Sequence, residues 1–304
     1  MKLSIKNISK TYPNGIEALK NVSLEIGNGM FGLLGPNGAG KSTLMRTIAA
    51  LQDADNGSIT VGDIDVSKDK QSLREILGYL PQEFGVYPKI SANDLLDHLA
   101  VMKGIIDSKQ RKEVVESLLH QPNLWEAKDQ KLGTYSGGMK QRFGIAQALI
   151  GDPKLIIVDE PTAGLDPMER NRFHNLLSEI GENVIVILST HIVDDVSDLC
   201  NNMAIILNGE VHLVGEPIQL IKTLDQKVWK GLIEKSDLVE IEKENDVISS
   251  RLYLGKVQVR IFSESPMQYG FESVNPEIED LYFATINGLS IGGSELYVEV
   301  YFRF

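Results

Sequence analysis

Residues 35–43 have the types and the spacing of a loop that binds phosphate groups. They read Gly-Pro-Asn-Gly-Ala-Gly-Lys-Ser-Thr, which fits the pattern Gly-x-x-x-x-Gly-Lys-Ser. Glycines let backbone N–H groups turn inward onto a polyphosphate, and a following helix adds the positive end of its dipole. Lys41 is placed to reach the β- and γ-phosphates, and the hydroxyl of Ser42 to hold Mg²⁺. The loop residues that we expect at a nucleotide are Asn37, Gly38, Ala39, Gly40, Lys41, Ser42 and Thr43.

Two carboxylates, Asp159 and Glu160, follow the apolar run 155–158. This pattern is typical of a central parallel strand whose C-terminal end reaches a ligand, although a charged strand end before a proline is the simpler alternative. Asp159 can hold Mg²⁺ through water, and Glu160 can orient and deprotonate an attacking water. His191 follows another apolar run, 184–188, and is placed either at a γ-phosphate or in a solvent-facing loop. Together these groups predict hydrolysis of a nucleotide phosphate.

The elements that position these groups follow from the hydrophobic pattern. Residues 30–34 are expected to form a buried strand, and residues 42–50 a helix with apolar side chains at helical spacing. Short antiparallel strands are expected within residues 1–34, helices within 91–120, and a hairpin that turns at Asn208-Gly209. Further strands are expected at 58–61, 77–80, 155–158, 184–188, 204–207 and 210–214.

Two weaker signals depend on their surroundings. Tyr12 lies just before a turn, where an aromatic ring either ends a strand or stacks on a nucleobase. Ser136 is a natural N-cap for a helix that continues through Gly137 and Gly138, and the glycines leave bare N–H groups that favour an anion. In the predicted helix at 91–120, Ser91 is the N-cap, and Leu95, Leu96, Leu99 and Met102 form an apolar stripe.

Bulk properties describe a protein with one large or two smaller domains. The chain has 304 residues, 42% hydrophobic and 24% charged, and a formal net charge of −12, which disfavours nucleic acid as the main partner. The only cysteine, Cys200, is expected to be buried, and the histidines show no metal-binding spacing. No run approaches 18 apolar residues, so we expect a cytoplasmic chain that does not cross a membrane alone.

The last part of the chain has no catalytic motif. Residues 225–304 are predicted to be strand-rich, with one helix at 276–286. We therefore expect a nucleotide-binding domain at 1–220, with a helical subdomain at about 85–150, and a C-terminal accessory α+β domain at 221–304. The final segment, 295–304, alternates apolar and polar residues and predicts a strand that packs on its own domain or on a partner.

The order of these motifs resembles the ATPase subunit of ATP-binding cassette (ABC) transporters over residues 1 to about 220. The resemblance implies an α/β fold in which a RecA-like lobe carries an antiparallel β subdomain and a helical subdomain. It also implies that ATP and Mg²⁺ bind, and that two copies form a head-to-tail dimer around two ATP molecules. The other expected partner is an integral membrane permease, which would place the chain on the inner face of the cell membrane.

The resemblance assigns roles to further residues. Tyr12 would stack on adenine, and Gln82 would sense Mg²⁺ and the attacking water and link the site to the permease. Residues 136–138 match the signature that binds the γ-phosphate on the opposite subunit. The segment 163–166, which ends at Asp166, matches the loop that crosses the dimer interface, and His191 matches the switch histidine. The permease contact is expected between the nucleotide lobe and the helical insert, around residues 82–99, with the apolar and aromatic segment 84–88.

The signature departs from the usual Leu-Ser-Gly-Gly-Gln, because residues 135–139 read Tyr-Ser-Gly-Gly-Met. This variant, and the acidic and aromatic segment 276–282, resemble a subgroup of prokaryotic cassettes that power export of drugs, antibiotics or sodium through separately encoded permeases. The alternative is a soluble cassette ATPase that acts on DNA or ribosomes. Such relatives usually carry coiled coils, a cysteine hook or two cassettes, whereas this chain has one phosphate loop, no heptad run and one cysteine. A catalytically dead regulatory binder is disfavoured by the intact Lys41, Asp159, Glu160 and His191.

Overall fold

The computed structural model describes residues 1–82, 85, 87–162, 164–181, 183–267 and 270–289. The chain begins with a four-stranded antiparallel sheet in the order β2-β1-β4-β5. Leu3 pairs with Ile26 and Ile5 with Leu24, and these four side chains are buried. The alternation of buried and exposed residues therefore forms the antiparallel strands that the sequence predicted. These strands are β1 (Leu3–Thr11), β2 (Glu17–Ile26), β4 (Asn56–Val61) and β5 (Ile64–Asp65).

A second, six-stranded sheet lies at the centre of the nucleotide lobe, in the order β10-β9-β3-β8-β7-β6. Five neighbouring strands of this sheet run parallel, namely β9, β3, β8, β7 and β6. Strand β10 lies at the edge and pairs antiparallel with β9. Asn208 and Gly209 connect β9 to β10 with positive φ angles of 50° and 82°, which confirms the predicted hairpin turn. The strands are β3 (Gly29–Leu34), β6 (Leu77–Leu80), β7 (Leu155–Asp159), β8 (Ile185–Thr190), β9 (Asn202–Leu207) and β10 (Glu210–Gly215).

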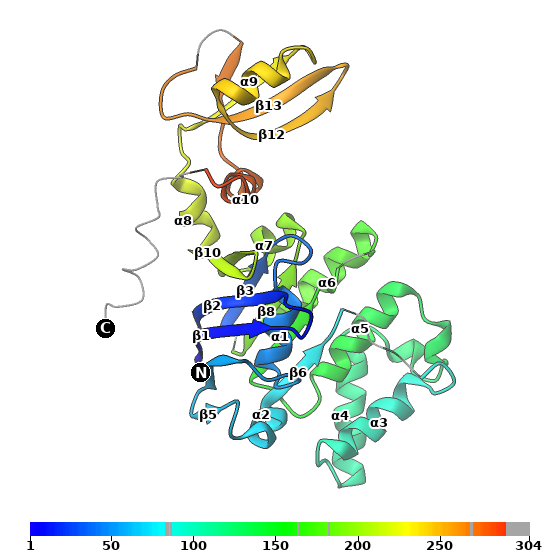
Figure 1. Cartoon of the computed structure of the whole chain (residues 1–304). Coiled ribbons are helices and arrows are strands. Elements are labelled where there is room, and N and C mark those ends of the chain that lie inside the picture. The colour runs from blue at the N-terminus through cyan, green and yellow to red at the C-terminus, as the bar shows by residue number, and fades with distance from the viewer. Residues whose placement is uncertain (83–84, 86, 163, 182, 268–269, 290–304) are drawn as a thin grey trace.

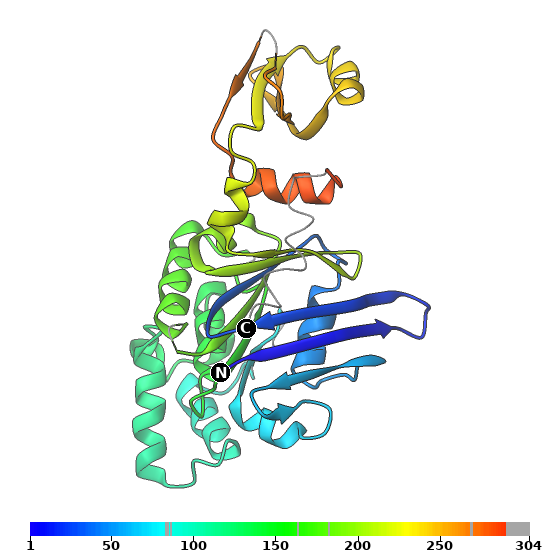
Figure 2. The same cartoon turned by 90° about the vertical axis from the view of Figure 1, so that its left-hand side faces the viewer.

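Both faces of the central sheet are covered, which explains why its strands are continuously apolar. Leu155 and Ile157 face the antiparallel sheet and α1 (Lys41–Ile48). Ile156 and Val158 point the other way, toward the helices α6 (Pro167–Ile180) and α7 (Val193–Leu199). Figure 2 shows these layers, with β1, β2 and α1 (blue) on one side of the central sheet and the green helices on the other. Between β5 and β6 lies the short helix α2 (Lys70–Ile76).

Three helices form a separate apolar cluster beside this lobe. They are α3 (Ala92–Met102), α4 (Ser108–His120) and α5 (Gly137–Ala148), with the 3₁₀ turns η1 (Trp125–Ala127) and η2 (Leu132–Thr134) between them. Ser91 caps α3 as predicted, because its Oγ accepts the amide of Asp94 at 3.1 Å. The predicted stripe was wrong at its end: Met102 is 72% exposed, since the last turn of α3 passes the edge of the cluster.

The C-terminal part contains a third sheet in the order β12-β13-β11-β14. Its strands are β11 (Val228–Ile233), β12 (Asp246–Tyr253), β13 (Lys256–Phe262) and β14 (Phe271–Ser273). The prediction of one helix there was wrong, because α9 (Leu238–Glu244) lies on this sheet as well as α10 (Ile278–Ile286). Glu and Lys residues dominate α9, and only Leu238 and Ile241 anchor it to the sheet, so its apolar signal is weak. The predicted strand at 295–304 lies outside the described residues.

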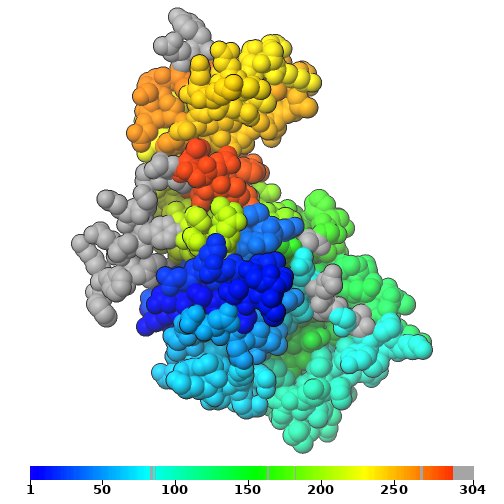
Figure 3. Space-filling view, in the orientation of Figure 1, coloured from blue at the N-terminus to red at the C-terminus, as the bar shows by residue number. Residues whose placement is uncertain are grey.

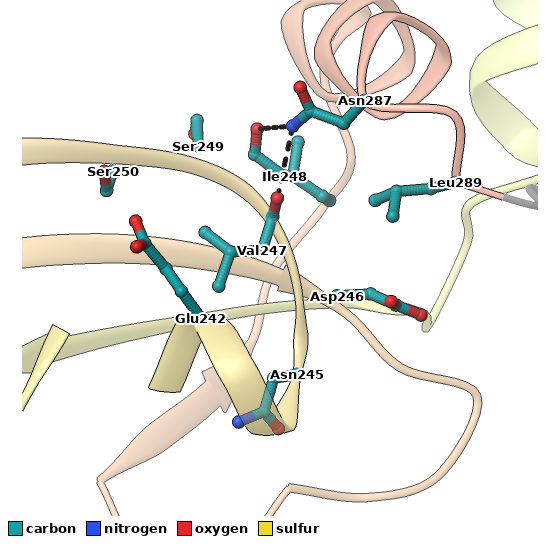
Figure 4. Close-up of a pocket in the computed structure, with 9 residues that line it drawn as sticks. All are labelled: Glu242, Asn245, Asp246, Val247, Ile248, Ser249, Ser250, Asn287 and Leu289. Atoms are coloured by element: carbon teal, nitrogen blue, oxygen red, sulfur yellow. Dashed lines mark hydrogen bonds between the residues drawn. The ribbon is translucent and has the colours of Figure 1, made fainter. Parts of the chain in front are cut away.

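Helix α10 joins this sheet to the nucleotide lobe. It contacts α7, α8 (Pro217–Lys222) and β9 on one side and β12 on the other, so it lies between the two parts (Figures 1 and 3). Arg260 on β13 donates two hydrogen bonds to the buried Asp280 at the start of α10. At its other end, Asn287 donates to the carbonyls of Val247 and Ile248 at 3.3 and 3.1 Å, beside an open depression of about 430 Å³ (Figure 4). A boundary at residue 220 falls inside α8, and the division into domains stays a prediction.

Candidate nucleotide site

The phosphate loop connects β3 to α1, as its sequence predicts. Gly40 is the N-cap of α1 with a φ of 109°, and a Cβ there would meet the carbonyl oxygen of Ala18 at 2.5 Å. A larger residue would therefore suffer both a backbone penalty and a clash. Gly35 is equally tight, because a Cβ would meet the carbonyl oxygen of Ile206 at 2.3 Å. Ala18 lies on β2 and Ile206 on β9, so these two strands hold the loop from both sides at the C-terminal edge of the central sheet.

Lys41 is buried inside this loop. Its Nζ donates to the carbonyls of Gly35 and Pro36 at 2.7 and 3.1 Å and lies 3.5 Å from Oε1 of Glu160. Burial lowers the pKa of Lys41, and the carboxylates of Glu160 and Asp159 partly offset this effect. Both hydrogen-bond acceptors of the ammonium group are neutral loop carbonyls, which a more strongly charged phosphate can replace.

The carboxylate of Glu160 contacts side chains from three other parts of the chain, which include Lys41 of the phosphate loop. Its Oε2 accepts the side-chain amide of Gln82 at 2.9 Å, and its Oε1 lies 3.3 Å from Nδ1 of His191. The backbone of Glu160 has a φ of 49°, and its amide donates to the carbonyl of Ser189 at 2.9 Å. A non-glycine residue in the left-handed region is strained, and such strain gathers where side-chain direction matters. The carboxylate is therefore aimed between β6, β8 and the phosphate loop.

Asp159 supplies the observation that bears on Mg²⁺. It is buried, and its Oδ1 has no hydrogen-bond partner among the described residues. An orphaned carboxylate oxygen close to a phosphate loop is the type of donor that a hard divalent cation takes. The oxygen donors that the sequence predicted for Mg²⁺, on Ser42, Gln82 and Asp159, thus fit this cation.

An open pocket of about 820 Å³ lies in front of the loop. Tyr12 lines it, and the hydroxyl of Tyr12 is within 3.2 Å of Thr43 Oγ1 and Gln52 Oε1. Ile16 and the Asn208-Gly209 turn also line it, although we had not expected them there. The other predicted residues that line this pocket are Asn37, Gly38, Gly40, Lys41, Ser42, Thr43, Gln82 and Glu160. Ala39 is buried behind the loop.

The predicted signature is not part of this pocket. Ser136 caps α5 by accepting the amide of Met139 at 3.2 Å, and Gly137 follows it on the surface. A Cβ on Gly138 would meet Oε2 of Glu169 at 2.5 Å, so glycine lets α5 pack against α6. Asp166 caps α6 by accepting the amide of Glu169 at 2.9 Å and also lies outside the pocket. Ala163 of the same loop lies outside the described residues, as do Glu83, Phe84 and Val86 of the expected permease contact.

One buried cluster escaped the sequence analysis. The carboxylate of Asp195 on α7 accepts hydrogen bonds from Thr162, Arg170, His174 and Thr190. Asp195 lies four residues after His191, but the pattern does not show which of the neighbouring Asp194 and Asp195 points inward. Cys200 is buried as expected, and burial raises the pKa of its thiol to about 12. Within the described ranges, no group of three His, Cys, Asp or Glu side chains could hold a metal.

A strand, a glycine-rich loop and a helix that surround a buried lysine and a pair of carboxylates define a phosphate-loop ATPase. The family model of ABC transporters matches residues 19–163. The ABC transporter ATP-binding protein YxlF of Bacillus subtilis (strain 168) is 33% identical over 302 residues, which cover 94% of this chain and 99% of YxlF. The chain belongs to the family of ABC transporter ATP-binding proteins.

Two further relatives have names that state a transport role. The linearmycin resistance ATP-binding protein LnrL of Bacillus subtilis (strain 168) is 37% identical, over 73% of this chain and 71% of LnrL. The methionine import ATP-binding protein MetN of Clostridioides difficile (strain 630) is also 37% identical, over 77% of this chain and 74% of MetN. Among solved structures, the dimeric ATP-binding cassette MJ0796 bound to ADP and Pi is 28% identical, with a TM-score of 0.64. That similarity covers 70% of this chain and 98% of MJ0796 and confirms the cassette fold.

These findings confirm that the chain is an ATPase subunit of the ABC class that binds ATP. They also support association of two cassettes, because MJ0796 is a dimer. In the part of the chain that the structure describes, no helix is both long and apolar enough to cross a membrane.

Proposed function

We propose that this chain hydrolyses ATP in a head-to-tail dimer and drives export through a separately encoded membrane permease. The observation that carries the dimer is the separation of the two halves of the site. Lys41 and Glu160 line the nucleotide pocket, whereas Ser136 and Gly137 lie outside it on the exposed start of α5. Bare N–H groups at a helix start favour an anion, so a second copy would supply this half across a two-fold axis.

The chemistry within one site follows from the contacts of Glu160. A water oxygen attacks the γ-phosphorus, Glu160 accepts a proton of that water, and the bond to the bridging oxygen breaks as ADP leaves. Gln82 and His191 hold the two carboxylate oxygens of Glu160 at opposite ends, which orients it toward the water. Lys41 exchanges its loop carbonyls for the phosphates. Mg²⁺, held by Ser42, Gln82 and Asp159, would neutralise charge that develops on the phosphate oxygens.

The roles of the remaining predicted residues belong to this proposal. Tyr12 would stack on adenine from the wall of the pocket. The γ-phosphate would contact Ser136, Gly137 and Gly138 of the second copy, and the loop that ends at Asp166 would cross between the two copies. ATP then acts as a removable link: both copies bind its charge, and hydrolysis weakens the interface.

A groove of about 770 Å³ between the nucleotide lobe and the helical part is the proposed permease contact. Residues of helix α2, strand β6 and the end of α3 line it. Met102 exposes its side chain there, next to the partly buried Leu99. Lys103 donates to the carbonyls of Arg74 and Leu77 at 2.8 and 3.0 Å and fastens α3 to the lobe. A movement of α3 would therefore displace β6 and with it Gln82, which follows the end of β6.

Export is supported by the Tyr-Ser-Gly-Gly-Met signature and by the resistance role in the name of LnrL. The name of MetN states an import role, so similar ATP-binding subunits serve both directions of transport. The permease would therefore determine the direction. The chain would lie on the inner face of the cell membrane through this partner. Residues 221–304 would form an accessory domain that docks on the cassette through α10.

The proposal is tested by purification of tagged Glu160→Gln from detergent-solubilised membranes in the presence of ATP. We expect a multi-span membrane protein in near-equal amount, identified by mass spectrometry. Met102→Lys should abolish that recovery without loss of ATP binding, whereas Val239→Lys, at another exposed apolar position on α9, should not. Recovery in the soluble fraction with ribosomal or DNA-bound partners would instead establish the alternative, a soluble cassette ATPase. Transport of labelled substrates in vesicles prepared with the recovered permease then decides between export and import.

A further inference from the structure

Asp195 contacts both segments that carry the groups around the attacking water, although it does not touch the nucleotide pocket. Its side chain is fully buried on α7. Oδ2 accepts the hydroxyl of Thr162 at 2.5 Å and the hydroxyl of Thr190 at 3.1 Å. Thr162 lies two residues after Glu160, and Thr190 lies one residue before His191. A single oxygen atom therefore connects the segment of the proposed base to the segment of the switch histidine.

The second carboxylate oxygen extends this connection to α6. Oδ1 accepts Nε of Arg170 at 2.8 Å and lies 2.8 Å from Nε2 of His174. Arg170 lies in the first turns of α6, directly after the loop that ends at Asp166. Asp195 thus contacts residues before and after that loop, through Thr162 and Arg170.

The hydroxyl of Thr190 also fixes the backbone on the far side of His191. It accepts the amide of Ile192 at 2.9 Å while it donates to Asp195. His191 lies between these two residues, and its Nδ1 is 3.3 Å from Oε1 of Glu160. A shift of Asp195 would move both partners of that 3.3 Å contact.

We propose that Asp195 is a positioning residue for ATP hydrolysis, which holds Glu160 and His191 in register through Thr162 and Thr190. This inference rests on the proposed roles of Glu160 and His191. The competing account is that Asp195 only neutralises Arg170 and pairs with His174 inside the lobe, in which case its loss affects stability alone. The two accounts differ in what they predict for the hydroxyl groups of the threonines.

The central experiment compares steady-state ATPase kinetics of the full chain and its variants, at equal amounts of folded protein. Asp195→Asn keeps the size of the side chain, and Thr162→Val keeps its shape but removes the hydroxyl. Both should lower kcat by about 10- to 100-fold, as expected for a misplaced reacting group, with KM for ATP changed by less than about twofold. Thr162→Ser retains the hydroxyl and should restore kcat to near the parent value.

The matched control is Asp194→Asn. Asp194 is the neighbouring residue on the same helix, but it is exposed, and its Oδ2 only approaches Arg170 at 3.9 Å. This variant should keep the parent kcat. The double variant Thr162→Val with Asp195→Asn should be no slower than the worse single variant, because both changes remove one connection.

A second measurement does not depend on activity. Hydrogen exchange of the peptides 160–170 and 189–195 should accelerate together in Asp195→Asn and stay unchanged in Asp194→Asn. Parent-like kcat and exchange in folded Asp195→Asn would overturn the inference.

Glu160→Gln separates this failure from a failure of the proposed function. If Glu160→Gln hydrolyses ATP at the parent rate, the assignment of the base is wrong. If Glu160→Gln is inactive while Asp195→Asn and Thr162→Val keep the parent kcat, the base stands and the role of Asp195 is wrong.

Discussion

The side-chain amide of Gln82 donates to Oε2 of Glu160 at 2.9 Å, although the two residues are 78 positions apart. Gln82 is the second residue after β6, and Glu160 is the first after the neighbouring parallel strand β7, so the sheet brings them to one edge. Because β6 lines the proposed permease groove together with α2 and the end of α3, this bond connects the groove to the proposed base. Under the proposed function, we expect a change at the groove to alter the orientation of Glu160 through Gln82.

Tyr12 should contribute to ATP affinity through its ring. Tyr12→Ala should weaken ATP binding by about tenfold or more, because aromatic stacking on a base is worth roughly 1–3 kcal/mol. Tyr12→Phe retains the ring but loses the hydrogen bonds of the hydroxyl to Thr43 and Gln52, and it should bind ATP almost normally. Titration with a fluorescent ATP analogue checks both. Equal weakening in the two variants would show that the hydroxyl, and not the ring, is what matters.

Lys41→Met should weaken nucleotide binding by at least about tenfold, because the variant keeps the buried stem and removes the charge that attracts the phosphates. Isothermal titration with ATP measures this loss, and Lys154→Met, at an exposed site far from the pocket, is the control. The variant leaves the buried carboxylate of Glu160 without its neighbouring cation, so circular dichroism should first show that the protein is folded. Unchanged affinity would remove Lys41 from the site.

The pair formed by Arg260 and Asp280 should stabilise the attachment of α10. Asp280→Asn removes the charge of a side chain that is 1% exposed and leaves the guanidinium with only the exposed carboxylate of Glu277 at 4.0 Å, at a cost of about 3 kcal/mol. Urea unfolding, followed by the fluorescence of Trp229 in a Trp125→Phe background, reports this part of the chain. Glu279→Gln, at an exposed position beside it, should cost less than about 0.5 kcal/mol. A similar small loss for both variants would contradict the role of the pair.

Asp195 should make stability depend on pH in acid. Burial alone would raise the pKa of Asp195, but hydrogen bonds from His174 and Thr162 and the charge of Arg170 hold it below its usual value. A lowered folded-state pKa favours folding above the unfolded-state value, about 3.9, and this contribution is lost as the pH falls through the folded-state pKa. The urea concentration at the midpoint of unfolding should be measured from about pH 6 to about pH 2, which spans the unfolded-state pKa. It should fall more steeply with decreasing pH for the parent chain than for Asp195→Asn. Parallel curves would show that Asp195 has no such linkage.

Short motifs of neighbouring residues predicted most of the fold. The phosphate loop, the cap at Ser136 and the turn at Asn208-Gly209 each need only a few neighbouring residues, and all three have the expected geometry. Helix α9 was missed because three apolar residues in a short charged segment, of which two pack on the sheet, give little periodicity. The exposure of Met102 could not be predicted either, since it depends on where α3 leaves its neighbours rather than on α3 itself.

The candidate site was predictable in its parts but not in its connections. Lys41, Asp159 and Glu160 belong to short motifs whose chemistry is evident from residue type and spacing. The contacts of Glu160 with Gln82 and His191, and those of Asp195 with Thr162 and Thr190, join segments that only the order of strands brings together. No local pattern records that order, so Asp195 was visible only in the structure.

The proposed two-copy site is tested most directly by the oligomeric state of Glu160→Gln in analytical ultracentrifugation. The account predicts a dimer with ATP and Mg²⁺, a monomer with ADP, and turnover at least about 100-fold slower than the parent chain. Ser136→Glu, which places a negative charge where a phosphate should bind, should abolish the ATP-dependent dimer when combined with Glu160→Gln. A Glu160→Gln chain that binds ATP but sediments as a monomer with both nucleotides would contradict the account.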